Sequence, residues 1–302
     1  MKARATNTQD FRETRFTLSS GTLAAKLWGP ENGLPVLALH GWLDNANTFD
    51  LLAKELPGIR LVALDLAGHG LSAHRPAGGS YYLWDHLADV AEVVQQLGWQ
   101  RFSLVGHSMG AGIACWFAGT FVDKVDRLVL IDGFGAPFSV ESESLPGYLR
   151  KAIRRRMLAF KSPIARFAEG KQHQFSSFDE AVAERRNGKF GKLTDEAAAI
   201  LLRRGLEAVE GGYRWRNDPR LTLPAYMEPN EAAIHAFIRK ITAPTCLILG
   251  NQGLFGKGEK AERLQAFSQL ELHRLPGDHH LHLGPHATEV GQTVRKFLVS
   301  SP

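Results

Sequence analysis

The sequence predicts an α/β protein with a doubly wound, mostly parallel sheet and a helical insertion. Three observations predict it: short apolar runs end in glycine, helical patterns alternate with them, and the alternation stops mid-chain and later resumes. Apolar runs without internal alternation are typical of parallel strands buried on both faces. A chain of 302 residues suits one such domain carrying an insertion.

Residues 14–132 alternate between predicted strands and helices. They open with RFTL and TLAAKLW around Ser20-Gly21, which we expect to form a hairpin. VLALHG and RLVALDLAG are predicted as buried strands. YLWDHLADVAEVVQQLG carries apolar residues at helical spacing and ends at Gly98, the expected C-cap. FSLVGHSMGAGIACWFAG indicates strand, sharp turn and small-residue helix, and DRLVLIDG another strand.

Residues 134–240 are predicted to form a helical cap over a core made of residues 1–133 and 241–302. Strand-like runs give way there to charged helical segments such as GYLRKAIRRRMLAF, FDEAVAERRN and TDEAAAILLRRGLEAV. Alternation then resumes with APTCLILG and LELHRLPG as strands and GEKAERLQAF and TEVGQTVRKFLV as helices. We expect the insertion to cover the strand ends, where doubly wound sheets bind ligands.

Composition narrows the classes of function. Residues 134–240 hold 19 Lys and Arg against 13 Asp and Glu, so the positive excess lies in the predicted cap. Its basic clusters are expected to be solvated helix faces, with no nucleic-acid partner: Arg154 to Arg156, Arg185-Arg186 and Arg203-Arg204. No apolar run approaches the ~18 residues of a membrane span, and the polar N-terminal stretch lacks a secretory core. A cytoplasmic protein is expected.

No cofactor or metal is expected. Cys115 and Cys246 lie in apolar stretches, where buried, inert thiols are typical, and two cysteines build no disulfide framework. Four histidines cluster late in the chain, and a metal site made from them is an alternative that lacks carboxylates at ligand spacing: His279, His280, His282 and His286.

Ser108 is the predicted nucleophile. It stands in GHSMG, residues 106–110, which fits G-x-S-x-G. An apolar strand precedes the motif and a helix rich in Ala and Gly follows, as in a sharp turn that holds a strained serine clear of the sheet. A plain strand–turn–helix connection is the alternative. The amides of Trp42, in HGW directly after the strand VLAL, and of Met109 are expected to form an oxyanion hole. His40 is expected to be a structural histidine.

The motifs HGWLDNANTFD, LDLAGHGLS, GHSMG and GDHHLHL together resemble the α/β-hydrolase superfamily. They look most like its serine-hydrolase-like (Kraken-related) branch, with secondary similarity to lipases, esterases and haloalkane dehalogenases. The resemblance covers about residues 14–132 and 241–300, and the cap segment GGYRWRNDPRL shares it. The family's G-x-H-x-x-H signature implies His279 as general base, with His280 as the fallback and His282 as a packing residue.

The triad acid departs from the family pattern. Relatives usually place it in G-x-x-D after the penultimate strand, but residues 250–253 are GNQG. Some superfamily members use a carboxylate one strand earlier, and LIDG supplies Asp132 there. We predict Asp132 as the acid that orients the histidine. A non-catalytic Asp at this point is the alternative, in which case Glu259 or Asp278 would be the next candidates. Asp65 is predicted to hold its loop in place.

A carboxylesterase-like serine hydrolase follows from these predictions. A serine at the elbow excludes haloalkane dehalogenases and epoxide hydrolases, which need an aspartate there. The expected substrate is a small ester with a hydrophobic group, which apolar cap residues facing the site would favour: Tyr148, Leu149, Met157, Leu158 and Phe160. C–C bond hydrolysis or cofactor-free perhydrolysis on the same triad are alternatives, and so is a non-catalytic ligand receptor.

Overall fold

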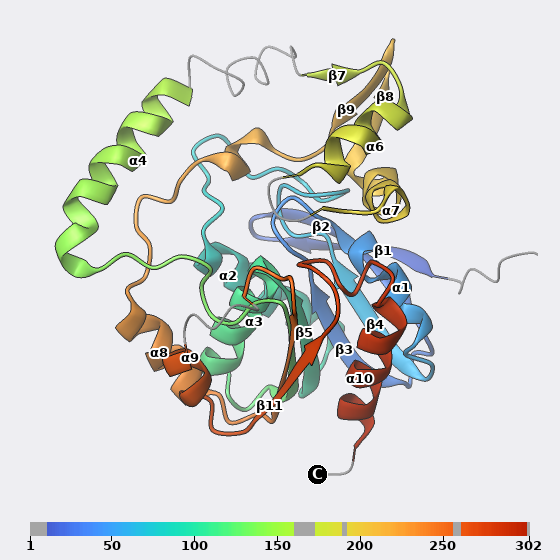
Figure 1. The fold of residues 1–302 in the computed structure, drawn as a ribbon, viewed down its shortest axis with the longest axis vertical. Helices are drawn as coiled ribbons and strands as arrows, with labels where there is room; N and C mark the ends of the chain where they lie inside the picture. The colour runs from blue at the N-terminus through green and yellow to red at the C-terminus, as the bar shows by residue number, and fades with distance from the viewer. Residues whose placement is uncertain (1–10, 160–172, 189–191, 256–260, 301–302) are drawn as a thin grey trace, which may run out of the picture.

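A twisted eight-stranded sheet forms the centre of the molecule (Figure 1). The computed structural model describes residues 11–159, 173–188, 192–255 and 261–300. In spatial order the strands are β1 (Arg12–Leu18), β2 (Gly21–Trp28), β4 (Ile59–Leu64), β3 (Leu34–Leu39), β5 (Phe102–His107), β6 (Val125–Ile131), β10 (Thr245–Gly250) and β11 (Leu270–Leu275). From β4 to β11 all neighbours pair in parallel, whereas β1–β2 and β2–β4 pair antiparallel. The predicted mostly parallel sheet is confirmed.

Two local predictions are also confirmed. β1 and β2 form the opening hairpin, with Leu18 opposite Gly21 in the register. Helix α2 (Leu83–Leu97) ends at Gly98, whose φ of 68° is the left-handed conformation of a C-cap. In both places a glycine occurs where the backbone needs a positive φ, which makes these boundaries readable from the sequence.

Helices cover both faces of the sheet. On one face lie α2, α3 (Met109–Thr120), α8 (Glu231–Lys240) and α9 (Ala261–Gln265), and on the other α1 (Asp50–Lys54) and α10 (Ala287–Val299) (Figure 1). Alternate strand residues serve the two layers: Leu104 of β5 packs with the first set and Val105 with the second. Each such side chain, once buried, stabilises the fold by roughly 1.5–3 kcal/mol.

The segment between β6 and β10 contains η2 (Ser142–Ser144), α4 (Leu145–Ala159), α6 (Phe178–Arg186), α7 (Asp195–Gly205) and η3 (Pro219–Thr222). It also contains a small antiparallel sheet in the order β7 (Gln174–Phe175), β9 (Gly212–Trp215), β8 (Leu206–Val209). The expectation of helix through Val209 was wrong, because α7 ends at Gly205. Gly211 and Gly212, with φ of 83° and 148°, turn a hairpin whose four-residue strands are too short to show an alternating pattern.

The last helix of residues 134–240 packs against the main sheet's helices. Phe237 of α8 stacks on Trp116 of α3 with ring centroids 4.5 Å apart, and Ile234 and Ile238 are fully buried in the same core cluster. The division into core and cap at residue 240 stays a prediction. In the described parts of the chain, no helix combines the length and apolarity needed to cross a bilayer.

Candidate active site

Ser108 lies at a sharp turn between β5 and α3. Its φ of 52° and ψ of −115° are strained for a residue with a side chain, a conformation that costs on the order of 1–3 kcal/mol and clusters at functional sites. The two motif glycines make the turn sterically possible. A Cβ at Gly106 would come within 2.5 Å of the Gly110 carbonyl oxygen, and one at Gly110 within 2.1 Å of the Leu39 carbonyl oxygen. The G-x-S-x-G pattern therefore reflects close backbone packing around the serine.

His279 lies beside Ser108, in the loop that joins β11 to α10. Its Nε2 is 2.8 Å from Ser108 Oγ, and its Nδ1 is 2.5 Å from Asp132 Oδ2. A carboxylate only accepts hydrogen bonds, so Nδ1 carries the proton and Nε2 presents a lone pair to the serine hydroxyl. This is the tautomer that a general base requires.

Asp132 follows β6 directly, and the register of the sheet explains its position. His107 of β5 pairs with Ile131 of β6, so the next residues, Ser108 and Asp132, emerge at the same edge. The fully buried Asp132 carboxylate accepts hydrogen bonds from the amides of Gly250, at 3.2 Å, and Leu254, at 2.9 Å. Asp278, by contrast, accepts a bond from the His280 amide, and Glu259 lies outside the described residues.

Position 253, the usual place of the acid, has no room for a side chain in this structure. A Cβ built there would lie 2.2 Å from Asp132 Oδ1 and 2.6 Å from its Cγ. The Asp132 carboxylate thus occupies the space that a side chain at 253 would need. With this backbone, a side chain at position 253 and the carboxylate of Asp132 exclude each other. The glycine at 253 is the indication of this in the sequence.

The two amides expected to form an oxyanion hole come from two segments, the turn at Ser108 and the loop after β3. Met109 is the first residue of α3, where helix geometry leaves the amide without an i−4 carbonyl. Trp42 is in the loop after β3, and its indole Nε1 donates to the Leu221 carbonyl at 3.0 Å. This loop touches the serine turn, because a Cβ at Gly41 would lie 2.9 Å from His107 Nδ1.

The other histidines near the site are bound elsewhere. His280 Nε2 is 3.1 Å from Asp44 Oδ2, His282 Nε2 is 2.8 Å from Thr48 Oγ1, and His107 Nε2 is 2.9 Å from the His279 carbonyl oxygen. The four late histidines therefore do not converge on one metal position. Among the described residues, one group of three potential metal ligands lies close together: Asp44, His107 and His280.

Asp44 is a buried anion that the sequence reasoning missed. Burial alone would raise its pKa, but His280, Arg185 and His107 hold the pKa well below its ordinary value. Arg185 Nη2 of α6 lies 2.7 Å from Asp44 Oδ1 and is 15% exposed. The expectation that this arginine is solvated was wrong. The sequence signal available for Asp44 was its place as a polar residue three positions after the pair His40-Gly41.

Arg204 of α7 corrects the same expectation. It is 5% exposed and bonds the fully buried Asp65 at 2.7 Å and Glu13 at 2.6 Å. Asp65 also accepts hydrogen bonds from the amides of Ala46 and Leu71, at 2.8 and 2.7 Å, as expected of a residue that holds its loop. Arg185 and Arg204 together tie the segment after β6 to the loops around the site.

His40 has a structural role, as predicted. Its Nδ1 donates to the Gly41 carbonyl at 2.7 Å, and its Nε2 accepts from the Leu66 amide at 2.9 Å. Burial lowers the pKa of His40 to about 4 and that of His282 to about 3, so both rings are neutral. Both cysteines are buried thiols, and burial raises the pKa of Cys115 to about 12.

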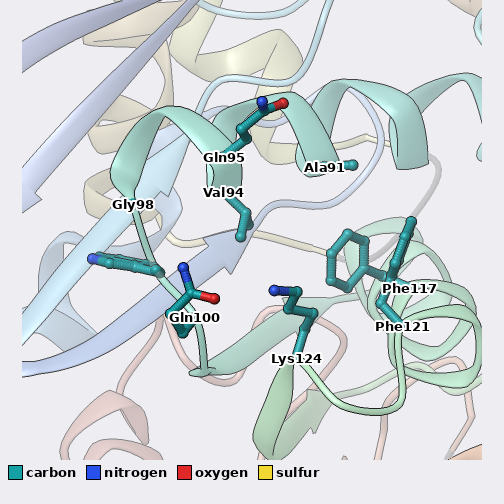
Figure 2. Close-up of a pocket in the computed structure, with 9 residues that line it drawn as sticks. Ala91, Val94, Gln95, Gly98, Gln100, Phe117, Phe121 and Lys124 are labelled. Carbon is teal, nitrogen blue, oxygen red and sulfur yellow. The ribbon is translucent and has the colours of Figure 1, made fainter.

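A hollow of about 300 Å³ is shown in Figure 2. Val94 and Gln95 of α2, Phe117 of α3, and Gln100 and Lys124 are among the residues that line it. Gln100 precedes β5 and Ser108 follows it, so the length of a six-residue strand, about 20 Å, separates the hollow from the serine. It is not part of the candidate active site.

The chain belongs to the α/β-hydrolase fold family, which it matches over residues 35–284. It is 33% identical to a serine hydrolase-like protein of Danio rerio, over 95% of this chain and 88% of that protein. A crystal structure of a hypothetical protein from Pseudomonas aeruginosa PAO1 shares 44% identity over 94% of this chain and 97% of its own, with a TM-score of 0.85. A thioesterase domain from the curacin biosynthetic pathway shares 25% identity over 96% and 100%, with a TM-score of 0.78.

The fold and these relatives define the class of protein. It is a hydrolase of the α/β-hydrolase fold, and it belongs with the serine hydrolase-like proteins.

Proposed function

We propose that this hydrolase is a carboxylesterase-like serine enzyme that works through an acyl-enzyme intermediate. The observation that carries the proposal is the unbroken hydrogen-bonded chain from Ser108 Oγ through the His279 ring to the Asp132 carboxylate. A serine, a buried histidine and a buried carboxylate in this order supply a nucleophile, a base and a group that orients the base. The thioesterase similarity also supports acyl transfer.

Each residue has a role in the proposed mechanism. His279 Nε2 takes the hydroxyl proton while Ser108 Oγ bonds to the ester carbonyl carbon, and the amides of Trp42 and Met109 hold the resulting oxyanion. The protonated ring, stabilised by Asp132, then gives its proton to the departing alcohol oxygen. A water molecule, deprotonated by His279, attacks the acyl-enzyme, releases the carboxylic acid and restores the serine.

The segment of residues 134–240 is proposed as the cap over this site and the core as residues 1–133 and 241–302. Arg185 and Arg204 support this, because their ion pairs with Asp44 and Asp65 attach the segment to loops at the carboxyl ends of β3 and β4. The substrate is proposed to be a small ester with a hydrophobic group. The cytoplasmic location stays a prediction.

Covalent labelling tests the nucleophile. A fluorophosphonate probe should label the native protein and not Ser108→Ala, because only an activated serine attacks phosphorus. Ser103→Ala is the matched control, since Ser103 lies on the same β5 strand, is buried, and its hydroxyl makes no hydrogen bond within the described structure. Labelling that survives in Ser108→Ala would mean that another residue is the nucleophile.

A substrate panel tests the reaction. p-Nitrophenyl esters of increasing acyl length should be hydrolysed, with the highest kcat/KM for an acyl chain longer than acetyl. β-Diketones and hydrogen peroxide with a carboxylic acid are run beside them. Preferred cleavage of the diketone would replace the proposal with C–C bond hydrolysis, and preferred peracid formation would replace it with perhydrolysis. A labelled protein that turns over none of these substrates would contradict the ester assignment.

A further inference from the structure

Helix α4 stands apart from the sheet and is attached along one side (Figure 1). On that side Ala152 is buried, the Tyr148 hydroxyl donates to Glu228 at 3.2 Å, and Arg156 Nε donates to the Pro224 carbonyl at 2.9 Å. The Arg156 guanidinium also lies 4.4 Å from the centre of the Tyr226 ring. Residues 224–228 thus run beside the helix and hold it in one orientation.

An exposed apolar stripe runs along α4 next to the attached side. Leu149, Ile153 and Met157 are 36%, 42% and 65% exposed, and their spacing of four residues aligns them on one face of a helix. Leu158 is 63% exposed and lies beyond Arg154, about 100° around the helix from Met157. Three of these residues were expected to face the active site, but the structure exposes them to solvent. Phe160, the next apolar residue, lies outside the described residues.

Positive charge borders this stripe. Arg150, Lys151, Arg154 and Arg155 are all exposed, and the helix sequence contains no acidic residue. At 100° per residue, Arg150 and Arg154 fall next to the stripe formed by Leu149, Ile153 and Met157, with Lys151 and Arg155 beyond them. The nearest acidic residues along the chain belong to the exposed turn before α4, and Glu228 binds Tyr148 on the attached side. The exposed face is therefore apolar and cationic together.

The charge of this face selects its partner. A second copy of the chain docking face to face would bring two sets of like charges together, which opposes association. A surface rich in anionic lipid complements the cations, and its acyl region accepts the exposed side chains of a basic amphipathic helix lying in the interface. We propose that the exposed face of α4 docks the enzyme on anionic lipid bilayers. The proposal goes beyond ester hydrolysis and does not depend on it.

Vesicle sedimentation tests the docking surface. The intact protein, as wild type and as Ser108→Ala, is mixed with vesicles of phosphatidylserine and phosphatidylcholine or of phosphatidylcholine alone. Both proteins should sediment with the anionic vesicles and much less with the zwitterionic ones, and the bound fraction should fall as salt screens the charges. Using the Ser108→Ala protein separates lipid binding from any effect of catalysis.

Paired variants test the assignment to α4. Arg150→Ser with Arg154→Ser should lower the partition coefficient by about 25-fold, since each basic residue near an anionic surface contributes roughly a fivefold gain. Ile153→Ser with Met157→Ser should also abolish most binding. Arg239→Ser with Lys240→Ser on the exposed end of α8 removes the same charge elsewhere and should bind nearly as well as wild type. Circular dichroism melting checks that each variant is folded.

Three results would overturn the proposal. One is equal sedimentation with both kinds of vesicle, or with neither. Another is an equal loss of binding in the α8 pair, because net charge and not α4 would then cause it. The third is a concentration-dependent dimer that the Ile153→Ser and Met157→Ser variant loses, which would assign the apolar stripe to a second copy of the chain.

Discussion

The adjacent histidines His279 and His280 each bind a buried carboxylate, but the two pairs make different connections. His279 joins Asp132 to the Ser108 hydroxyl, so both ring nitrogens are used. His280 binds Asp44, which is bound in turn by Arg185 of α6, and its Nδ1 has no hydrogen-bond partner among the described residues. A histidine–carboxylate pair alone is therefore not a signature of catalysis. The partners of each pair distinguish them: the His279 ring also reaches the Ser108 hydroxyl, whereas the carboxylate bound by His280 reaches Arg185 of α6.

The largest expected difference between the pairs is in kcat. His279→Ala should lower kcat about 10⁶-fold, the scale seen when the base of such a triad is removed, because the serine loses its proton acceptor. His280→Ala should lower kcat by a far smaller factor, since its ring does not reach Ser108. Steady-state kinetics on the best p-nitrophenyl ester measures both. Comparable losses of kcat in the two variants would contradict this distinction between His279 and His280.

The two carboxylates should differ in the same way. Asp132→Asn should lower kcat by about 10³–10⁴, because an uncharged amide no longer holds the imidazole in the accepting tautomer or stabilises the imidazolium. Asp44→Asn is the matched control and should act mainly on the melting temperature, since it weakens the bond to Arg185. Near-wild-type kcat in Asp132→Asn would show that the acid has been assigned wrongly.

Gly253 should affect activity through Asp132 alone. Gly253→Ala places a Cβ 2.2 Å from Asp132 Oδ1, so the carboxylate must move and the histidine loses its alignment. A shift of this kind should cost about a hundredfold in kcat with little change in KM. The double variant Asp132→Gly with Gly253→Asp moves the carboxylate to position 253 and should recover part of the lost kcat. Wild-type kinetics in Gly253→Ala would mean that the carboxylate position is unimportant.

The smallest effect concerns the stability of the buried neutral histidines. Burial lowers the pKa of His282 to about 3, whereas an unfolded histidine binds a proton below about 6.5. The unfolded state therefore takes up more protons as pH falls, and the free energy of unfolding decreases. Between pH 6.5 and 5, wild type should lose about 1.6 kcal/mol more than His282→Asn.

Urea unfolding at both pH values measures this difference. His173→Asn, which changes an exposed ring, is the control and should keep the wild-type dependence on pH. If His282→Asn shows that same dependence, the His282 ring does not stay neutral in the folded protein.

Much of the architecture was predictable because its signals are local. Gly21 marks a hairpin and Gly98 a helix end, and apolar runs mark buried parallel strands. The short sheet of β7, β8 and β9 was missed, since four residues are too few to separate a strand pattern from the end of a helix. The burial of Arg185 and Arg204 was missed for another reason: their partners are more than 130 positions away in the sequence.

The sequence alone determined the strand–turn–helix around Ser108, the place of His279 after the last strand, and the absence of a side chain at the usual acid position. These features depend on short-range geometry, which a few consecutive residues specify. Only the tertiary structure decided that Asp132 fills the space left at Gly253 and that Asp44 binds Arg185. Those relations depend on which strands become neighbours in the sheet and how the segment after β6 packs on them, and burial then forces each charged group to find a partner.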